Sequence, residues 1–347
     1  MPATQIGGLL SMQFVLAIRG QFPPGDDMSA RFEELMEQVR LAKRLGFSGI
    51  AKSCHYSSSP WQEIQQIPFL ARAAAEAPGL TFITSIVLLP LHKPLEIAEQ
   101  TAALDLFTGG RFILGVGIGY RDVEFKAFGT TRAERVPRLV ENIQAIKRLW
   151  TEDAVTMKGS HFELDGAVCS LKPRRPPPIW IGANADPAIR RAAHIADSWM
   201  INPHNRIDTI LRQIEVYKRG LEEAGKPWPE TLPLAREMFV ARTRAEAVQL
   251  ARPYLEAKYK AYHAWGQDKA MPEGDNDLGQ EFDELARDRF LFGSADEVAE
   301  QIVGMMKATG ANQLSLPIQW PGMPQNLVLE QMHVMAEEVV PRVRQGL

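Results

Sequence analysis

The sequence predicts an α/β protein, a (β/α)8 barrel formed by one domain that spans residues 1–347. Eight short apolar runs with the character of strands alternate with stretches whose apolar residues recur at helical spacing. Such alternation implies parallel strands joined by helical crossovers, and eight units favour closure into a barrel over an open sheet. The length of 347 residues and the 45% of hydrophobic residues suit one large domain with insertions.

The strand-like runs are short and bounded by turn residues. In chain order they are 12–18, 47–51, 80–87, 112–116, 179–182, 198–201, 234–241 and 313–317. The first helix is expected to begin at Ser29 as its N-cap, and the helix after the fourth strand near Glu134. A Ser294-x-x-Glu297 capping box predicts the start of the last crossover helix, and residues 155–164 predict a hairpin before the fifth strand.

Residues 242–292 exceed the simple alternation and are expected to form an insertion after strand seven. Residues 245–265 have a helical pattern, and the acidic, Gly- and Pro-containing segment 271–278 predicts a mobile loop. Because insertions at the carboxyl ends of barrel strands usually cover the active site, we expect this one to be a lid.

Composition excludes several classes of function. Lys and Arg total 39 against 42 Asp and Glu, without long runs of one sign, so nothing predicts binding to nucleic acid or to an acidic membrane. No apolar stretch reaches the roughly 20 residues of a membrane span, and the first residues do not resemble a secretory signal, so we expect a cytoplasmic protein. The two cysteines are far apart and no H-E-x-x-H motif occurs, so the sequence does not predict a metal site. It has no G-x-S-x-G motif either, so it does not predict a serine hydrolase.

The most informative segment, 104–129, reads LDLFTGGRFILGVGIGYRDVEFKAFG. Its fourth strand ends in alternate glycines, Gly115, Gly117 and Gly119, where backbone can approach a ligand closely. A dinucleotide fingerprint is excluded because Tyr120 and Asp122 stand where it needs its third glycine. The alternative is that these glycines only relieve crowding inside a barrel strand.

This segment resembles the L-D-x-x-S-G-G-R-x-x-x-G-x-G-x-G pattern of the luciferase-like monooxygenase family, with Thr108 where Ser is commoner. Pro90, His92 and Pro94 are similar to the family's P-x-x-H-P loop, with Lys93 inserted, and 178–199 resembles its P-x-x-I-G-G segment. The resemblance implies a barrel that binds a flavin and is weakest over the insertion.

The run IWIGANADPAIRRAA predicts a strand, a turn and a helix that starts with Asp186 as N-cap and Pro187 at its first position. Free N–H groups at such a turn bind anions, so it could hold a flavin phosphate, with Arg121 as the neutralising charge; an ordinary capped helix is the alternative. The resemblance implies a cis peptide bond between Ser85 and Ile86 against the flavin ring. The cofactor-binding residues expected are Ser85, Ile86, Gly117, Gly119, Tyr120, Arg121, Gly182, Ala183 and Asn184.

His55 is the candidate catalytic residue. It follows the second strand, matches the family's E-H-H or D-H motif, and an imidazole can exchange protons near neutral pH. Cys54 departs from that motif, and a buried thiol there is expected to be inert. A structural loop histidine is the alternative. For an apolar substrate pocket we expect Phe14, Tyr56, His263 and Trp320, although core packing is the default for such residues.

The resemblance implies a two-component monooxygenase. Reduced FMN from a separate flavin reductase would react with O2 to a C4a-(hydro)peroxyflavin, which oxygenates a small organic substrate. The first alternative is F420-dependent hydride transfer, which would need a basic groove for the acidic tail of that cofactor; only Arg174 and Arg175 stand out in the sequence. The second is a catalytically silent flavin-binding protein. We also expect a homodimer, the commonest assembly.

Overall fold

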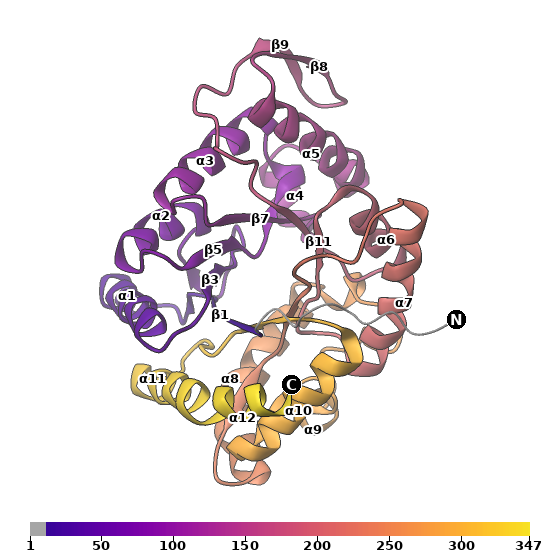
Figure 1. Ribbon diagram of the computed structural model, residues 1–347. Coiled ribbons are helices and arrows are strands. Elements are labelled where there is room, and N and C mark those ends of the chain that lie inside the picture. Colours follow the sequence, from indigo (N-terminus) through magenta and orange to yellow (C-terminus); the bar gives the residue numbers. More distant parts are fainter. Residues whose placement is uncertain (1–11) are drawn as a thin grey trace.

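Eight parallel strands enclose the centre of the molecule and helices surround them, as the computed structural model shows for residues 12–347 (Figure 1). The barrel strands are β1 (Gln13–Ile18), β3 (Gly49–Lys52), β5 (Thr81–Thr84), β7 (Phe112–Gly117), β10 (Ile179–Gly182), β11 (Ser198–Met200), β12 (Pro233–Ala235) and β15 (Gln313–Leu316). Their order is β11-β10-β7-β5-β3-β1-β15-β12. A parallel bridge between Ile201 and Leu234 joins the two ends, so the predicted barrel is confirmed.

Side chains alternate between the two faces of each barrel strand. Val15, Ala51, Ile83, Trp180 and Met200 form a cluster inside the barrel. The neighbours of these residues, Phe14 and Leu16 among them, belong instead to the larger core between strands and helices. This alternation decides which residues can reach a ligand at the barrel mouth.

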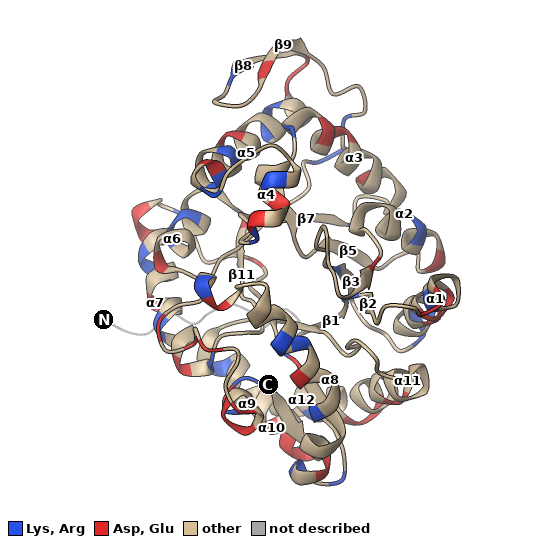
Figure 2. Cartoon of the chain, turned by 180° about the vertical axis from the view of Figure 1, so that it is seen from behind, with Lys and Arg blue, Asp and Glu red and all other residues tan. Residues whose placement is uncertain are grey.

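The outer helices bury one face against the strands. They are α1 (Met28–Arg44), α2 (Gln66–Glu76), α3 (Pro94–Phe107), α5 (Arg135–Thr151), α6 (Asp186–Ile195), α7 (Ile207–Glu223), α10 (Ala295–Thr309) and α11 (Gln325–Val334), followed by a π-helical turn (Met335–Val339) and α12 (Val340–Gly346). Figure 2 shows Lys and Arg interspersed with Asp and Glu on these helices. Within residues 12–347 we find no helix with the length and apolar character that crossing a bilayer requires.

Helix starts agree with the sequence only in part. The capping box of Ser294 and Glu297 is present at α10. For α1 the prediction was wrong by two residues, because Asp27 is the N-cap and its carboxylate accepts from the N–H groups of Ser29 and Ala30. Asp186 is the first residue of α6 instead of its cap, and its carboxylate binds Arg212 at 2.6 Å.

Short elements fill the loops. The expected hairpin is present as β8 (Val155–Lys158) and β9 (Glu163–Ala167). The remaining small elements are β2 (Gln21–Phe22), β4 (Gln62–Glu63), β6 (Val87–Leu88), and 3-10 turns at Leu89–Leu91 and Arg132–Glu134. The sequence did not predict α4 (Asp122–Ala127), which follows the Gly-rich strand β7 before the expected α5.

The insertion begins earlier than predicted, because the expected strand 234–241 divides in two and only its first part belongs to the barrel. Its first part is the barrel strand β12, and its second part, β13 (Met238–Val240), pairs with β14 (Leu291–Gly293). Between them lie α8 (Arg244–Ala264), a 3-10 turn (Asp268–Ala270) and α9 (Phe282–Ala286). The segment 271–278, predicted to be a mobile loop, is anchored by the fully buried Asp275, whose carboxylate binds Arg289 at 2.8 Å.

Candidate active site and cofactor cavity

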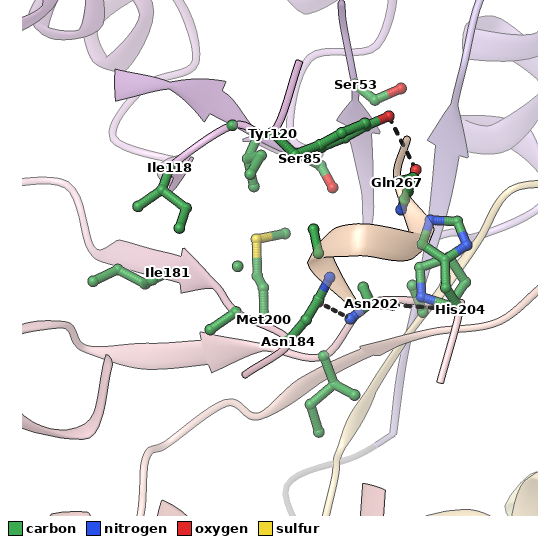
Figure 3. A pocket seen from close by; sticks show the side chains of 18 of the residues that line it. Ser53, Ser85, Ile118, Tyr120, Ile181, Asn184, Met200, Asn202, His204 and Gln267 are labelled. Carbon is green, nitrogen blue, oxygen red and sulfur yellow. Dashed lines mark hydrogen bonds between the residues drawn. The ribbon is translucent and has the colours of Figure 1, made fainter. Parts of the chain in front are cut away.

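A cavity of about 350 Å³ lies at the carboxyl ends of the barrel strands, the usual location of barrel active sites (Figure 3). The strands each contribute residues at or just after their last position. Lining residues include Ala17, Arg19, Ser53, Cys54, His55, Ser85, Ile86, Gly119, Tyr120, Ile181, Gly182, Ala183, Asn184, Met200, Asn202, His204 and Ser315. Figure 3 shows Met200 among them in the middle of the view.

The Ser85–Ile86 peptide bond at the end of β5 is cis, as the resemblance implied. The side chain of Ile86 lies against two glycines of neighbouring strands. A Cβ atom on Gly117 would stand 1.9 Å from Cδ1 of Ile86, and one on Gly182 would stand 3.4 Å from it. Gly117 therefore makes room for Ile86 and does not itself line the cavity, whereas Ile86 and Gly182 do.

His55 is held by a carboxylate. Nδ1 of His55 lies 3.1 Å from Oε1 of Glu124, which also accepts the backbone N–H of Tyr56 at 3.0 Å. Because a carboxylate only accepts, Nδ1 donates, and Nε2 is left with its lone pair for a ligand. Tyr120 packs edge-on against the His55 ring at a centroid distance of 5.7 Å. Glu124 thus fixes both the tautomer and the orientation of the imidazole.

Arg121 supports this arrangement from behind. Its guanidinium donates to the carbonyl oxygens of Tyr56 and Ser57 at 2.8 and 2.9 Å, and it lies 4.2 Å from the ring centroid of Trp265. The side chain is buried and does not line the cavity. The expectation that Arg121 neutralises a phosphate is corrected: it holds the loop that carries His55.

Cations other than Arg121 line the cavity. Arg135 at the start of α5, Arg191 in α6 and Lys269 in the insertion line the same cavity as Gly182, Ala183 and Asn184. Within residues 12–347 none of the three forms an ion pair with a carboxylate. Burial lowers the pKa of Arg191, and burial together with the charge of Arg132 lowers that of Arg135. Desolvated cations without anionic partners favour the binding of an anion.

Residues of the insertion line one side of the cavity. Tyr262, Gln267, Lys269 and Met271 line it from that side. The hydroxyl of Tyr120 donates to Oε1 of Gln267 at 3.1 Å, a contact drawn in Figure 3. The indole N–H of Trp265 donates to the carbonyl of Ser59 at 2.9 Å, so the insertion is bound to the loop after β3.

Comparison with known proteins agrees with this geometry. The family model described as luciferase-like monooxygenase matches residues 12–313. The chain belongs to the luciferase-like monooxygenase family. It is therefore an oxidoreductase of the kind that uses a flavin-type cofactor, FMN or F420.

Curated members of the luciferase-like family with similar sequences include F420-dependent enzymes. An F420-dependent glucose-6-phosphate dehydrogenase of Nakamurella multipartita is 28% identical over 329 residues, which cover 90% of this chain and 92% of the relative. An F420-dependent hydroxymycolic acid dehydrogenase of Mycobacterium tuberculosis is 29% identical over 219 residues, 60% of this chain and 59% of the relative.

Solved structures with a similar fold include a monooxygenase and an F420-dependent dehydrogenase. The monooxygenase RslO1 from Streptomyces bottropensis superposes with a TM-score of 0.83 at 25% identity, over 95% of this chain and 99% of that one. An F420-dependent secondary alcohol dehydrogenase superposes with a TM-score of 0.78 at 19% identity, over 96% and 99% of the two chains, and shows the shared fold.

The structure brings most of the expected cofactor residues together. Those that line the cavity are His55, Ser85, Ile86, Gly119, Tyr120, Gly182, Ala183 and Asn184. Their roles stay predictions, because position alone does not assign a function. Burial raises the pKa of Cys54 to about 12, which keeps the thiol protonated as expected.

The expected substrate residues lie elsewhere, and that set is corrected. Phe14 faces the helices because it alternates with Val15, and Tyr56 packs against Phe128 at 4.6 Å between ring centroids. His263 is half exposed and pairs with Asp268 at 2.8 Å. Trp320 is fully buried, and its indole N–H donates to Glu237 at 2.5 Å. All four side chains pack or form polar contacts outside the cavity.

Sequence reasoning missed Glu124, Arg135, Arg191 and Lys269. Glu124 stood in the quoted Gly-rich segment, three residues after Arg121, where an acid on a short helix after the strand was a usable signal. The three cations lie in separate elements and carry no local signal. Arg174 and Arg175, the candidates named for a basic groove, precede β10 at its amino end, whereas the cavity lies at its carboxyl end.

Proposed function

We propose that the protein is an F420-dependent oxidoreductase that transfers a hydride between the deazaflavin and a small organic substrate. The observation that carries this proposal is the convergence of Arg135, Arg191 and Lys269, without carboxylate partners in the described chain, beside the turn at Gly182–Asn184. F420 carries a phosphate and an acidic tail, and several unpaired cations suit such a polyanion. The curated relatives that use F420 support the same proposal.

His55 is the residue assigned to proton transfer. When bound, the deazaflavin supplies or accepts the hydride at a substrate carbon. Oxidation of an alcohol also releases the hydroxyl proton, and Nε2 of His55 is free to take it because Nδ1 is held by Glu124. In the reverse direction the same nitrogen returns the proton to the carbonyl oxygen. Glu124 acts through His55 and is a positioning residue.

The cavity also restricts water. Ile86, Met200 and Met271 supply apolar surface at its wall, and the insertion covers one side. A dry site strengthens the interactions of His55 with a polar substrate atom and protects a bound hydride carrier from side reactions. The chain's own contribution is thus binding, orientation, exclusion of water and movement of one proton.

A second candidate is the monooxygenase reaction with reduced FMN and O2. The likeness to the monooxygenase RslO1 favours it, and Arg135 and Arg191 also suit the single phosphate of FMN. Under this proposal a separate flavin reductase is a transient partner.

A catalytically silent flavin-binding protein is the third possibility, and the absence of turnover with either cofactor would support it. We also propose a homodimer, which light scattering tests.

The deciding experiment is a titration of the purified protein with F420 and with FMN, each oxidised and, without air, reduced. We expect F420 to bind at least about tenfold more tightly than FMN. Arg191→Gln should raise the Kd for F420 about tenfold, whereas Arg190→Gln, at an exposed neighbouring position of α6 paired with Glu223, should leave it unchanged. Tighter binding of FMN, with O2-dependent product formation, would move the assignment to the monooxygenase.

A further inference from the structure

A second group of charges lies beneath the insertion, away from Arg135 and Arg191. We name it the buried charge cluster. Its cations are Arg19, Lys52, Arg236, Lys258 and Arg289, and its carboxylates are Glu63, Glu237 and Asp275. All these side chains are at most 2% exposed except that of Arg19, which is 14% exposed. The cluster has more cations than carboxylates.

Three ion pairs use all the carboxylates of the cluster. Glu237 binds Lys258, Asp275 binds Arg289 at 2.8 Å, and Glu63 lies 3.9 Å from Lys52. Arg19 and Arg236 are left over. Arg19 reaches Glu237 only at 4.0 Å, and Arg236 forms no ion pair within residues 12–347.

Each of the two surplus guanidinium groups has a buried nitrogen atom without a hydrogen-bond acceptor within residues 12–347. Nε of Arg19 and Nη2 of Arg236 are buried without a partner in the described part of the chain. Nη1 of Arg236 has only long contacts, 3.4 Å each, to the carbonyls of Asn202 and Ala235. An unpaired buried donor costs about 1–3 kcal/mol and a buried charge costs more, so an anion bound at these groups would offset that cost.

Burial is the first cause of the lowered pKa values around the cluster. Burial, then the charges of Lys258 and Arg19, lower the pKa of His204 well below its usual value, so His204 is neutral. Burial lowers the pKa of Lys258 to about 8 and that of Arg236 to about 10. Burial opposes the charge of Arg19, but Tyr262 and Glu237 nearby outweigh it and raise its pKa, so Arg19 stays charged.

The cluster reaches the cavity next to His55. Arg19 and His204 line the cavity, and so do Asn202 and Ala235, which lie in front of Arg236. Tyr262 lies between the two histidines, with its ring centroid 6.1 Å from that of His55 and 5.9 Å from that of His204. An anion bound at Arg19 would therefore place the rest of a small molecule beside His55.

We propose that the substrate is an organic anion, a carboxylate or a phosphate monoester, and that Arg19 binds its anionic group while Arg236 supplies a second, unpaired charge behind it. The proposal rests on the proposed function in one respect, that a substrate shares this cavity with the cofactor. Guanidinium groups bind carboxylate and phosphate through two parallel hydrogen bonds, which suits both anions. The anion is distinct from the one held by Arg135 and Arg191.

Calorimetric titration tests this proposal, with the protein first saturated with whichever cofactor, F420 or FMN, it binds. The probes are benzoate, inorganic phosphate and the neutral benzamide. At least one anion should bind ten or more times as tightly as benzamide, and Arg19→Gln should raise its Kd at least tenfold. Tighter binding of benzoate alone indicates a carboxylate, and tighter binding of phosphate alone indicates a phosphate monoester. Arg242→Gln, on the exposed surface of the insertion, is the charge-matched control and should change nothing.

Two results would overturn the proposal: equal binding of benzamide and both anions, or an Arg19→Gln variant that keeps the wild-type affinity. Arg19→Lys keeps the positive charge but cannot make two parallel hydrogen bonds to the anion, so we expect an intermediate affinity. This variant also tests the proposal if Arg19→Gln does not fold. An Arg135→Gln/Arg191→Gln variant should keep binding the probe, because its anion site is the other one. Loss of F420 binding in that variant would test the proposed cofactor site. It would not test the anion site at Arg19.

Discussion

The cavity has two walls that are built in different ways. The barrel wall, from the ends of β5, β7 and β10, presents Ile86, Gly182 and their backbone, held in register by parallel strand pairing. The insertion wall presents Tyr262, Gln267 and Lys269, which side-chain contacts hold against residues far away in the sequence. Strand pairing is specified locally, whereas the insertion wall depends on individual side chains.

Under the proposed function, this difference suits the two walls to different tasks. The backbone-built wall is rigid and suits a cofactor shared by a whole family. The side-chain-built wall, which borders the buried charge cluster, can change by substitution without loss of the barrel, so it suits the recognition of a particular substrate. Variants in each wall should therefore fail in different ways.

The largest effect is expected at the barrel side, with His55→Ala. Loss of the proton-transferring group should lower kcat by a factor of about 10²–10⁴, while the affinity for the cofactor stays near that of the wild type. Steady-state kinetics and a cofactor titration measure the two effects. The matched control is His263→Ala, because His263 is half exposed and outside the cavity. Unchanged turnover in His55→Ala would remove His55 from the mechanism.

On the insertion side, Lys258→Met should act on stability. Lys258 and Glu237 form a fully buried ion pair, and the variant leaves the carboxylate without its cation. Breaking such a pair costs about 3–5 kcal/mol of the free energy of unfolding, measured by urea denaturation. Lys260→Met, which removes an exposed lysine of the same helix, should cost no more than about 0.5 kcal/mol. Equal losses in the two variants would contradict this account.

The two walls also explain what the sequence could and could not predict. Strands, glycine spacing and the turn at Gly182–Asn184 are local patterns, so the barrel and several residues of its cavity wall followed from them. Phe14 was misplaced because a one-residue shift reverses the face of a strand side chain. Arg121 and Glu124 are neighbours in the sequence, three residues apart, but only tertiary contacts bring them together with Trp265 and His55.

Glu124→Gln is expected to have a smaller effect than removal of His55. The amide of this variant can still contact the ring, but it can either accept a hydrogen bond from Nδ1 or donate one to it. Both tautomers of His55 should therefore become populated. We expect kcat to fall by about tenfold to a hundredfold with little change in KM. Nitrogen NMR of labelled histidine checks the cause: one tautomer in the wild type and a mixture in the variant. A single unchanged tautomer together with a lower kcat would assign Glu124 a purely structural role.

The smallest effect is a pH dependence that originates in the buried charge cluster. Burial and neighbouring cations lower the pKa of His204 in the folded protein, so below about pH 6.5 the unfolded chain binds a proton that the folded protein does not. The free energy of unfolding should therefore decrease as the pH is lowered below about 6.5, by up to about 1.4 kcal/mol per pH unit from this residue.

His204→Gln, measured by urea denaturation between pH 7 and pH 5, should show a shallower slope. His194→Gln, at an exposed position paired with Glu223, controls for loss of a histidine elsewhere. If both variants keep the wild-type slope, the acid sensitivity originates in carboxylates, and the positive charge around Arg19 and Arg236 is too weak to hold His204 neutral.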